Sequence, residues 1–310
     1  MEARMLLLHA LSPLHAGTGQ GAGAIDLPVA REKATGLPYL PGSSLKGVLR
    51  DACKNGETRK KIFGPDKDSA HEHAGSVQFS DQRLLLLPVR SLRGTFAWVT
   101  SPYILRRCRR DIENAIGFDK LPKIPLPDSI SGCYVTDNEC AITLDDHRVI
   151  FEDLDFTAVS DKDVRAWAIW IGKQIFPDGA DWQKMLSARF CVVHDDVMGF
   201  LLETATEVFA RIRLREDAKT VENNALWYEE ALPAETILSG LVFATPVKVE
   251  PEEVFKTLED LMEKPLQLGG KATVGRGLCR LLMTRGEISC ADPQPEICRQ
   301  DISTGEAAGR

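Results

Sequence analysis

Two hydrophobic periods recur along the chain and predict interspersed strands and helices. Residues 84–87 form a continuous apolar run, as buried strands do, whereas apolar residues at 164–176 and 252–264 are spaced by three and four, as on one face of a helix. Strands are predicted at residues 5–10, 77–89, 95–100, 238–249 and 278–283, and helices from 45 and at 103–116, 164–176 and 252–264. This order predicts an α+β fold with an antiparallel sheet and helices on one face.

A strictly alternating stretch predicts a β-hairpin within residues 206–232. Between 209 and 214, Arg211 and Arg213 alternate with apolar residues, the period of a half-buried strand with arginines on one face. The Asn-Asn pair at 223–224 is a turn signal, and the segment after it is the expected returning arm.

The distribution of polar and apolar segments predicts one domain with two insertions. The 310 residues are enough to bury a full core, which we place in residues 1–290. Residues 54–75 are polar and are expected to form an exposed insertion, whereas residues 117–163 are dense in proline and acidic side chains and are expected to form a long insertion with little regular structure. The polar segment 291–310 is predicted to be a disordered tail.

Charge changes this picture only locally. The formal net charge of −7 counts against a protein that coats nucleic acid through a general positive field. The cations, however, are clustered within residues 31–50, 106–110 and 211–215. The sequence therefore permits a basic face on an acidic body.

The cysteines point to a reducing compartment and not to zinc. Eight cysteines contain no Cys-x-x-Cys pair, and the His-x-His at 71–73 has no recognisable third ligand. Because there is neither a signal peptide nor an apolar run of transmembrane length, we expect a cytoplasmic protein with reduced thiols and no membrane partner.

Two segments combine a flexible or helix-starting backbone with cations. The loop GGKATVGRG at 269–277 would let the backbone approach a phosphate, although a tight turn needing positive φ also explains its glycines. It lacks the Lys-Ser/Thr ending of a nucleoside-triphosphate loop. The candidate anion-binding residues of this loop are Gly270, Lys271, Gly275, Arg276 and Gly277.

The second segment is the helix start at residues 41–50. We expect a serine at the N-cap, where Ser43, Ser44 and free backbone N–H groups would meet an anion. Lys46 and Arg50 lie one turn apart on the same face, which favours a phosphate over simple capping.

Three motifs in order resemble the RAMP superfamily of RNA-handling proteins. They are PLHAGTG at 13–19, LPGSSLKGVLR at 40–50 and GGKATVGRG at 269–277. Within that family, SD at 80–81, LPVRS at 87–91, FAWVTSP at 96–102 and ALWYEEALP at 225–233 resemble the backbone subunits of type III-B CRISPR (Cmr) effector complexes. The resemblance covers roughly residues 1 to 285.

The resemblance implies a fold and a set of partners. The expected fold is a ferredoxin-like (RRM-like) core, and the expected assembly is a filament of copies along a guide crRNA, together with other Cmr subunits, in antiviral defence. A protruding hairpin in such subunits kinks the guide–target duplex, and the target RNA is cut at regular intervals beside each kink. Gly17, Gly19, Arg211 and Arg213 join the expected RNA-binding residues.

Loop carboxylates are the cleavage residues of this family, which singles out Asp26. A loop aspartate is ordinarily a turn former or a cap, but beside phosphates it could activate a 2′-hydroxyl or hold a divalent ion, Mg²⁺ or Mn²⁺. His15 is a secondary candidate, followed by Tyr228, Glu229 and Glu230. Adjacent acids on a strand alternate sides, so at most one of the two glutamates should face RNA.

Two alternatives remain open at this point. A purely architectural RNA-binding subunit would share every glycine and lysine above and differ only in the chemistry of Asp26. A stand-alone endoribonuclease that processes guide RNA would be expected to have a pair of catalytic histidines, whereas His15 is alone in its loop.

Overall fold

The chain is built around one large sheet. The computed structural model describes residues 1–19, 21, 23–66, 73–117, 120–138, 140–215, 217 and 220–284. The strands of the large sheet are β1 (Glu2–Ala10), β2 (Tyr39–Leu40), β3 (Val77–Phe79), β4 (Gln82–Arg90), β5 (Phe96–Thr100), β6 (Gly132–Val135), β7 (Arg148–Phe151), β8 (Leu154–Ser160), β9 (Phe190–Val193), β12 (Ile237–Ala244), β13 (Leu266–Gln267) and β14 (Leu278–Met283).

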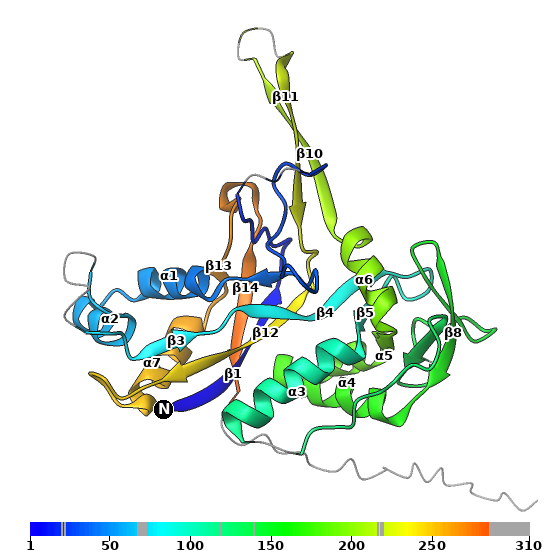
Figure 1. Cartoon of the computed structure of the whole chain (residues 1–310), viewed down its shortest axis with the longest axis horizontal. Coiled ribbons are helices and arrows are strands. Elements are labelled where there is room, and N and C mark those ends of the chain that lie inside the picture. The colour runs from blue at the N-terminus through cyan, green and yellow to red at the C-terminus, as the bar shows by residue number, and fades with distance from the viewer. Residues whose placement is uncertain are drawn as a thin grey trace, which may run out of the picture.

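Helices lie towards both ends of this sheet and, in the case of α3, against its central strands. They are α1 (Gly42–Ala52), α2 (Gly56–Phe63), α3 (Pro102–Ile116), α4 (Lys162–Ile175), α5 (Ala180–Arg189), α6 (Asp195–Thr204) and α7 (Pro251–Met262). Figure 1 shows α1, α2 and α7 at one end of the molecule and α3 to α6 at the other. No helix in the described part of the chain combines the length and the apolar character needed to cross a membrane.

The sheet is mostly antiparallel, which confirms the predicted α+β class. Its main path runs β13-β14-β1-β12-β4-β5-β9-β6-β8-β7, with β2 paired to β4 and β3 to β12. The two parallel pairs are β5 with β9 and β6 with β8. Both β1 and the apolar run of β4 are buried over most of their length, as continuous apolar strands require.

The core is positioned by helices on these central strands. Helix α3 contacts β1, β12 and β4, and α7 contacts β12 and β14. Trp98 of β5 is fully buried and donates its indole N–H to the carbonyl of Glu235 at 2.9 Å, so its one polar atom is satisfied. Each such large side chain contributes roughly 1.5–3 kcal/mol by burial.

Residues 117–163 were predicted to have little regular structure, and this prediction is wrong. Strands β6, β7 and β8 lie there and extend the large sheet through pairing of β6 with β9. These strands are only four to seven residues long. Local periodicity gives little sign of strands this short. Strand β6 pairs with β8 and β9 further along the chain, and β7 and β8 form a hairpin. The helices α5 and α6 were also missed.

The other predicted insertion, residues 54–75, contains helix α2. Asn55 caps it by accepting hydrogen bonds from the backbone N–H groups of Glu57 and Thr58 at 3.0 and 3.1 Å. Two predicted features lie outside the described residues. They are the first histidine of the His-x-His motif, His71, within residues 67–72, and the predicted tail at 291–310.

The predicted hairpin exists and stands away from the body (Figure 1). It consists of β10 (Glu207–Leu214) and β11 (Val221–Ala231), which pair with each other in a separate sheet. Two details of the prediction are wrong. Residues 223–224 belong to β11, because the register shifts after Ile212 and places the turn between 214 and 221. Nor is the apolar face buried, as one face of a half-buried strand would be: Ile212 is 50% exposed.

Candidate functional site

The loop that carries Asp26 runs alongside the base of the hairpin. Leu27 donates its N–H to the carbonyl of Tyr228 at 3.1 Å, and Glu230 donates to the carbonyl of Leu27 at 3.0 Å. The N–H of Tyr228 donates to Oδ2 of Asp26 at 2.8 Å. Asp26 is exposed, so its carboxylate is held against β11 while remaining open to a ligand.

The carboxylate of Glu230 holds the same loop through hydrogen bonds. Its Oε2 accepts the N–H of Val29 at 2.9 Å, and its Oε1 accepts from Arg31 at 2.6 Å. Arg31 also donates to the carbonyl of Leu202 at 2.8 Å. Because Glu230 is buried and uses both oxygens, it positions the loop and does not face solvent.

Glu229 points to the opposite side of β11, as adjacent residues on a strand must. Its carboxylate lies 2.7 Å from Nζ of Lys271 and 3.0 Å from a guanidinium nitrogen of Arg276, and it accepts from the Trp227 indole at 2.8 Å. Burial raises the pKa of Glu229, but hydrogen bonds from Lys271 and Trp227 and the charge of Arg276 bring the pKa down to about 2. Neither glutamate is exposed to RNA.

The glycine-rich loop 269–277 therefore meets a carboxylate of this same chain. Arg276 is 3% exposed and stacks its guanidinium 4.0 Å from the centre of the Phe209 ring in β10. Arg211 approaches Glu229 at 3.4 Å from the same strand. The cations expected to bind phosphate thus also join the loop to the hairpin, and Lys271 is the more accessible of the loop's two.

His15 lies buried between its own loop, residues 13–19, and the glycine-rich loop 269–277. Its Nδ1 is 2.6 Å from the carbonyl of Glu230, and its own carbonyl accepts the N–H of Gly270 at 2.9 Å. A Cβ on Gly17 would come within 2.5 Å of His15 Nε2, so the imidazole requires glycine there. This packing favours the structural role for His15. Gly277, at φ 79°, has no room for a Cβ, which would meet the carbonyl oxygen of Leu268 at 2.0 Å.

The second predicted anion site, at the start of α1, differs from expectation. The N-cap is Pro41, not a serine, and Ser43 and Ser44 are exposed residues inside the first turn. The N–H of Gly42 donates to Oδ1 of Asp81 at 2.9 Å, so a carboxylate of the chain already lies at this helix end.

The two cations of α1 have different surroundings. Lys46 is half-buried, and burial together with the nearby charge of Arg50 lowers its pKa. Arg50 donates to the carbonyl of Gly64 at 2.5 Å and pairs with Asp66 at 2.7 Å. Arg50 therefore also fixes the end of α2 against α1.

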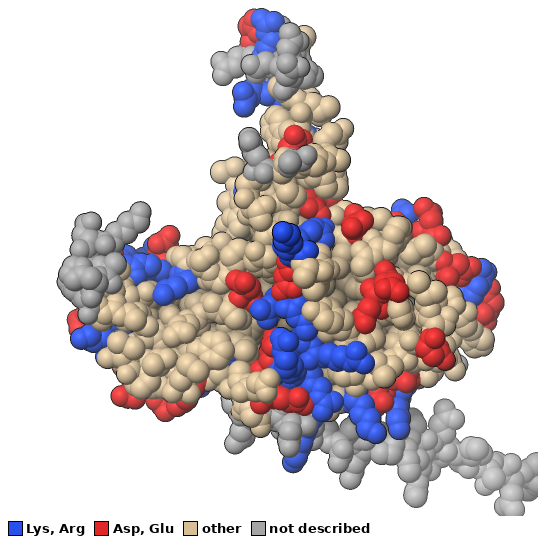
Figure 2. Space-filling model, in the orientation of Figure 1, with Lys and Arg blue, Asp and Glu red and all other residues tan. Residues whose placement is uncertain are grey.

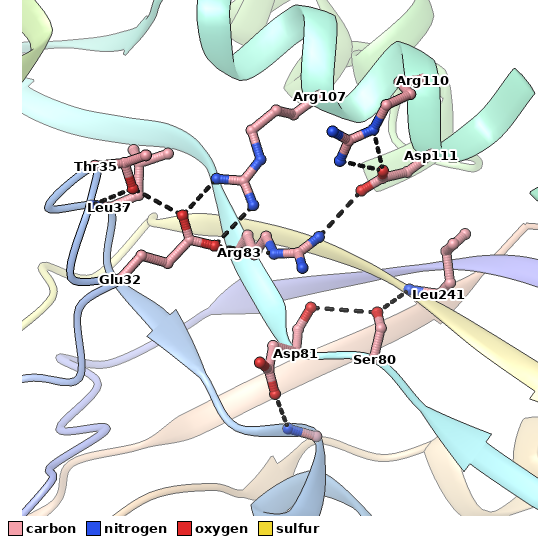
Figure 3. A network of polar contacts seen from close by, with 11 residues as sticks. Glu32, Thr35, Leu37, Ser80, Asp81, Arg83, Arg107, Arg110, Asp111 and Leu241 are labelled. Atoms are coloured by element: carbon pink, nitrogen blue, oxygen red, sulfur yellow. Dashed lines mark hydrogen bonds and ion pairs between the residues drawn. The ribbon is translucent and has the colours of Figure 1, made fainter. Parts of the chain in front are cut away.

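Lys and Arg side chains gather in a band down the middle of one face, from the hairpin base across α3 (Figure 2). Beneath it lies an ion network that the sequence did not reveal (Figure 3). Arg107 binds Glu32 through two hydrogen bonds at 2.5 and 2.7 Å, and Arg83 bridges Glu32 at 3.2 Å and Asp111 at 3.3 Å. The hydrogen bonds from Arg107 are the main cause that lowers the pKa of Glu32 to about 2.

A metal ion would find few protein ligands here. Among the residues that the structure describes, no three His, Cys, Asp or Glu side chains come together as a metal site. The single exposed carboxylate of Asp26 still fits Mg²⁺, because that ion is commonly bound through one or two carboxylates, substrate phosphates and water.

Comparison with known proteins places these features in a family. The RAMP superfamily model matches residues 7–280. The CRISPR system Cmr endoribonuclease Cmr4 of Pyrococcus furiosus is 35% identical over 290 residues, 91% of this chain and 96% of that protein. The CRISPR system CMR subunit Cmr4 of Saccharolobus solfataricus is 23% identical over 296 residues, 88% of this chain and 94% of that protein.

Solved structures agree at the level of the fold. A crystal structure of oligomeric Cmr4 from Pyrococcus furiosus superposes with a TM-score of 0.71 at 29% identity, covering 93% of this chain and all of that one. A cryo-EM structure of a type III-B Cmr-beta complex bound to cognate target RNA contains a chain that superposes with a TM-score of 0.70 at 20% identity, covering 91% of this chain and 97% of that chain.

Proposed function

Because the chain belongs to the RAMP superfamily, we propose that it is a crRNA-binding backbone subunit of a type III-B CRISPR complex that cleaves the target RNA paired with the guide. The observation that carries the catalytic part is Asp26, an exposed carboxylate held at the base of a protruding hairpin by the backbone of Tyr228. The relative that is 35% identical carries the name endoribonuclease.

The chemistry that suits a single carboxylate beside RNA is transesterification. Asp26 takes the proton of a target 2′-hydroxyl and the 2′ oxygen attacks the adjacent phosphorus, which leaves a 2′,3′-cyclic phosphate. The bond to the 5′ oxygen breaks as that oxygen takes a proton from water. An Mg²⁺ or Mn²⁺ ion held by Asp26 and phosphate oxygens would supply charge neutralisation at that phosphate. Of the secondary candidates His15, Tyr228, Glu229 and Glu230, only Tyr228 is exposed, at 40%.

The partners follow from the same assignment. Oligomeric Cmr4 and the target-bound Cmr-beta complex have this fold, which supports further copies of the chain, other Cmr subunits, crRNA and target RNA as partners in antiviral defence. Six of the eight cysteines lie in the described part of the chain, buried as free thiols, in keeping with a cytoplasmic complex.

We also interpret the core as ferredoxin-like. The central strands follow the order β14-β1-β12-β4, each antiparallel to its neighbour. Numbered by position in the chain this order is 4-1-3-2, and helices α1 and α7 follow the first and third of these strands. A β-α-β-β-α-β core with added strands and helices accounts for this arrangement.

Replacing Asp26 tests the catalytic proposal. In the assembled complex, Asp26→Ala should bind guide and target normally yet lower the cleavage rate by roughly 10² to 10⁴, the usual loss for a general base. Stability should change by no more than about 0.5 kcal/mol, because the side chain is exposed in a loop. Chelation of divalent ions should abolish cleavage by the unchanged complex.

Asp153, an exposed aspartate at the β7–β8 turn, provides the matched control. Asp153→Ala should cleave at the unchanged rate. If Asp26→Ala cleaves equally well, the subunit is architectural or its chemistry rests on Tyr228.

A further inference from the structure

A cavity of about 470 Å³ lies where the ends of β1 and β14 meet the turn that joins α4 to α5. None of its lining residues belongs to the loop of Asp26 or to the loop 269–277, so the proposed RNA cleavage does not account for it. The lining residues with aromatic or ionisable side chains are His9, Phe176, Asp178, Trp182, Glu235 and Arg280. They come from segments that are far apart in sequence and that only the fold brings together.

One wall of this cavity is aromatic. The ring of Trp182 stacks on the buried ring of Phe176, with the ring centres 5.3 Å apart. The Phe176 ring in turn lies perpendicular to the imidazole of His9, with centres 5.5 Å apart. This packing holds the indole in place, yet Trp182 remains 45% exposed. The indole of tryptophan is the best aromatic partner for a cation.

Most polar groups of the cavity accept hydrogen bonds. Nε2 of His9 lies 2.7 Å from Oε2 of Glu235, and because a carboxylate only accepts hydrogen bonds, Nε2 carries the ring proton. In the neutral ring Nδ1 is then an acceptor, and it is buried without a partner among the described residues. Buried polar atoms are rarely left without a partner, so this Nδ1 requires a donor that the described chain does not supply.

Two carboxylates add to these acceptors. Glu235 uses Oε2 for His9, and its side chain is 27% exposed. The exposed Asp178 makes no ion pair with any residue that the structure describes. The cavity therefore presents acceptors beside an aromatic wall, which is the arrangement that a positively charged donor needs.

The backbone holds Glu235 at this position. Its φ is 71°, in the left-handed region that residues other than glycine seldom adopt. Its N–H donates to the carbonyl of Ala10 at 2.7 Å, and its carbonyl accepts the indole N–H of Trp98 at 2.9 Å. Strained backbone of this kind clusters at ligand-binding sites.

The charge of the lining suits a single positive group. Asp178 and Glu235 carry two negative charges, whereas Arg280, exposed on β14 directly across from His9, carries one positive charge. A formal charge of −1 remains while His9 is neutral. This charge disfavours a phosphate, whereas an ammonium or guanidinium group neutralises it.

We propose that this cavity binds a guanidinium or ammonium group on an alkyl stem, the chemistry of arginine and lysine. The cation stacks on Trp182 and donates hydrogen bonds to Glu235 and Asp178. The stem contacts Leu11, which is 37% exposed at the cavity. This goes beyond the proposed function, because guide and target RNA carry no such cation. A free basic amino acid and a side chain of another protein molecule both carry it, and the experiment separates these two sources.

Ligand-observed NMR on the full chain measures the affinity. N-acetyl-arginine amide, whose only charge is the guanidinium, should receive saturation from the protein and bind in a saturable way. N-acetyl-citrulline amide has the same shape with a neutral group, and it should bind roughly tenfold more weakly. Free arginine separates the sources. Tighter binding than that of the amide identifies a free amino acid whose carboxylate pairs with Arg280, and equal or weaker binding identifies a protein side chain.

Variants of the lining locate the bound probe. Glu235→Gln removes one charge while keeping an oxygen for His9, and it should weaken binding of the arginine amide roughly tenfold. Trp182→Leu should weaken it roughly 2- to 5-fold through loss of the indole face. Asp181 is exposed beside Trp182 and does not line the cavity, so Asp181→Asn makes the same change in charge as the matched control and should leave the affinity unchanged. Thermal unfolding checks that each variant is folded.

Equal affinity for the arginine and citrulline amides would overturn the site, as would the lack of saturable binding. So would a loss in Asp181→Asn as large as that in Glu235→Gln, or folded Glu235→Gln and Trp182→Leu variants that bind like the unchanged chain. Asp26→Ala should bind the probe with unchanged affinity, so failure of the catalytic proposal would leave these results as they are.

Discussion

Single carboxylates decide which cations this protein presents to its surroundings. Glu229 neutralises Arg276 and Lys271, and Glu32 occupies Arg107 and Arg83. Part of the positive charge that is visible in the sequence is thus paired with carboxylates of the same chain. Buried or half-buried pairs of this kind do not guarantee stability, but removing one partner is costly because the other charge stays uncompensated.

Glu229 should make stability depend on acid pH. Its pKa in the folded chain is about 2, below its ordinary value of 4.5, so its contribution is fully present above pH 4.5 and is lost as pH falls towards 2. Glu229→Gln should destabilise the chain at neutral pH by about 3–5 kcal/mol and flatten that acid decline. Urea unfolding between pH 7 and 2.5 measures both effects.

Glu57, exposed on α2, is the control for this measurement. Glu57→Gln should leave the unfolding midpoint at neutral pH close to that of the unchanged chain. A Glu229→Gln variant that behaves like Glu57→Gln would show that the junction of loop and hairpin does not depend on this carboxylate.

At the scale of elements, the hairpin is held by its base and not by its length. Isolated two-stranded hairpins are at best marginally stable, and here the outer residues Ile212 and Leu226 are half exposed. The anchoring contacts involve the last residues of β11, through Glu229, Glu230 and the loop beside them, and the Phe209 ring of β10, on which Arg276 stacks. Strands β10 and β11 therefore project an apolar face that the chain itself leaves uncovered.

Shortening the hairpin should disturb binding or cleavage of the target while leaving folding intact. Ile212 pairs with Leu226, so residues 213–225 can be replaced by an Asn-Gly turn without changing the register of the base. Thermal unfolding and guide binding should change little, because the described strand residues of the removed segment belong to the separate two-stranded sheet and not to the large one. Target binding or the regular spacing of cuts, read from product lengths, should be disturbed. Loss of the folded state would mean that the outer hairpin belongs to the core.

At the scale of the whole molecule, affinity for RNA must overcome a net charge of −7. We expect local, sequence-independent phosphate contacts from Lys46, half-buried on α1, and Lys271, one-third exposed in the C-terminal loop. Arg276, which the sequence ranked equally, is buried against Phe209 and Glu229 and is a weaker choice for such a test.

Salt dependence gives the corresponding measurement. Lys46→Ala together with Lys271→Ala should weaken binding of unrelated single strands alike and reduce the slope of log affinity against log salt by about 1.4, at roughly 0.7 per phosphate contact. Lys248→Ala with Lys264→Ala removes two exposed lysines and the same charge as the control. A loss confined to one RNA sequence, or an equal loss in the control pair, would contradict local clamps.

The sequence by itself determined the elements that carry a hydrophobic pattern within their own residues. The apolar runs of β1 and β4 and the helical spacing of α4 and α7 led to correct elements, because burial on one or both faces imposes a period on the chain. Asp26 could be named from its motif context, and the structure adds that its loop lies along β11. Strand β6 and the hairpin turn were missed, since distant pairing and a register shift define them. The hairpin of β7 and β8 was missed because its strands are only four and seven residues long.

Only the tertiary structure decided which distant residue each charged side chain meets. Glu229 and Arg276 are 47 residues apart, Glu32 and Arg107 are 75 apart, and Tyr228 meets Asp26 across 202 residues. Periodicity in the sequence reports which side of an element is buried, but it carries no information on which distant side chain will be docked opposite. The GGKATVGRG loop predicts a phosphate site from its own residues, whereas only packing against β11 reveals that a carboxylate of the same chain, Glu229, lies against its two cations.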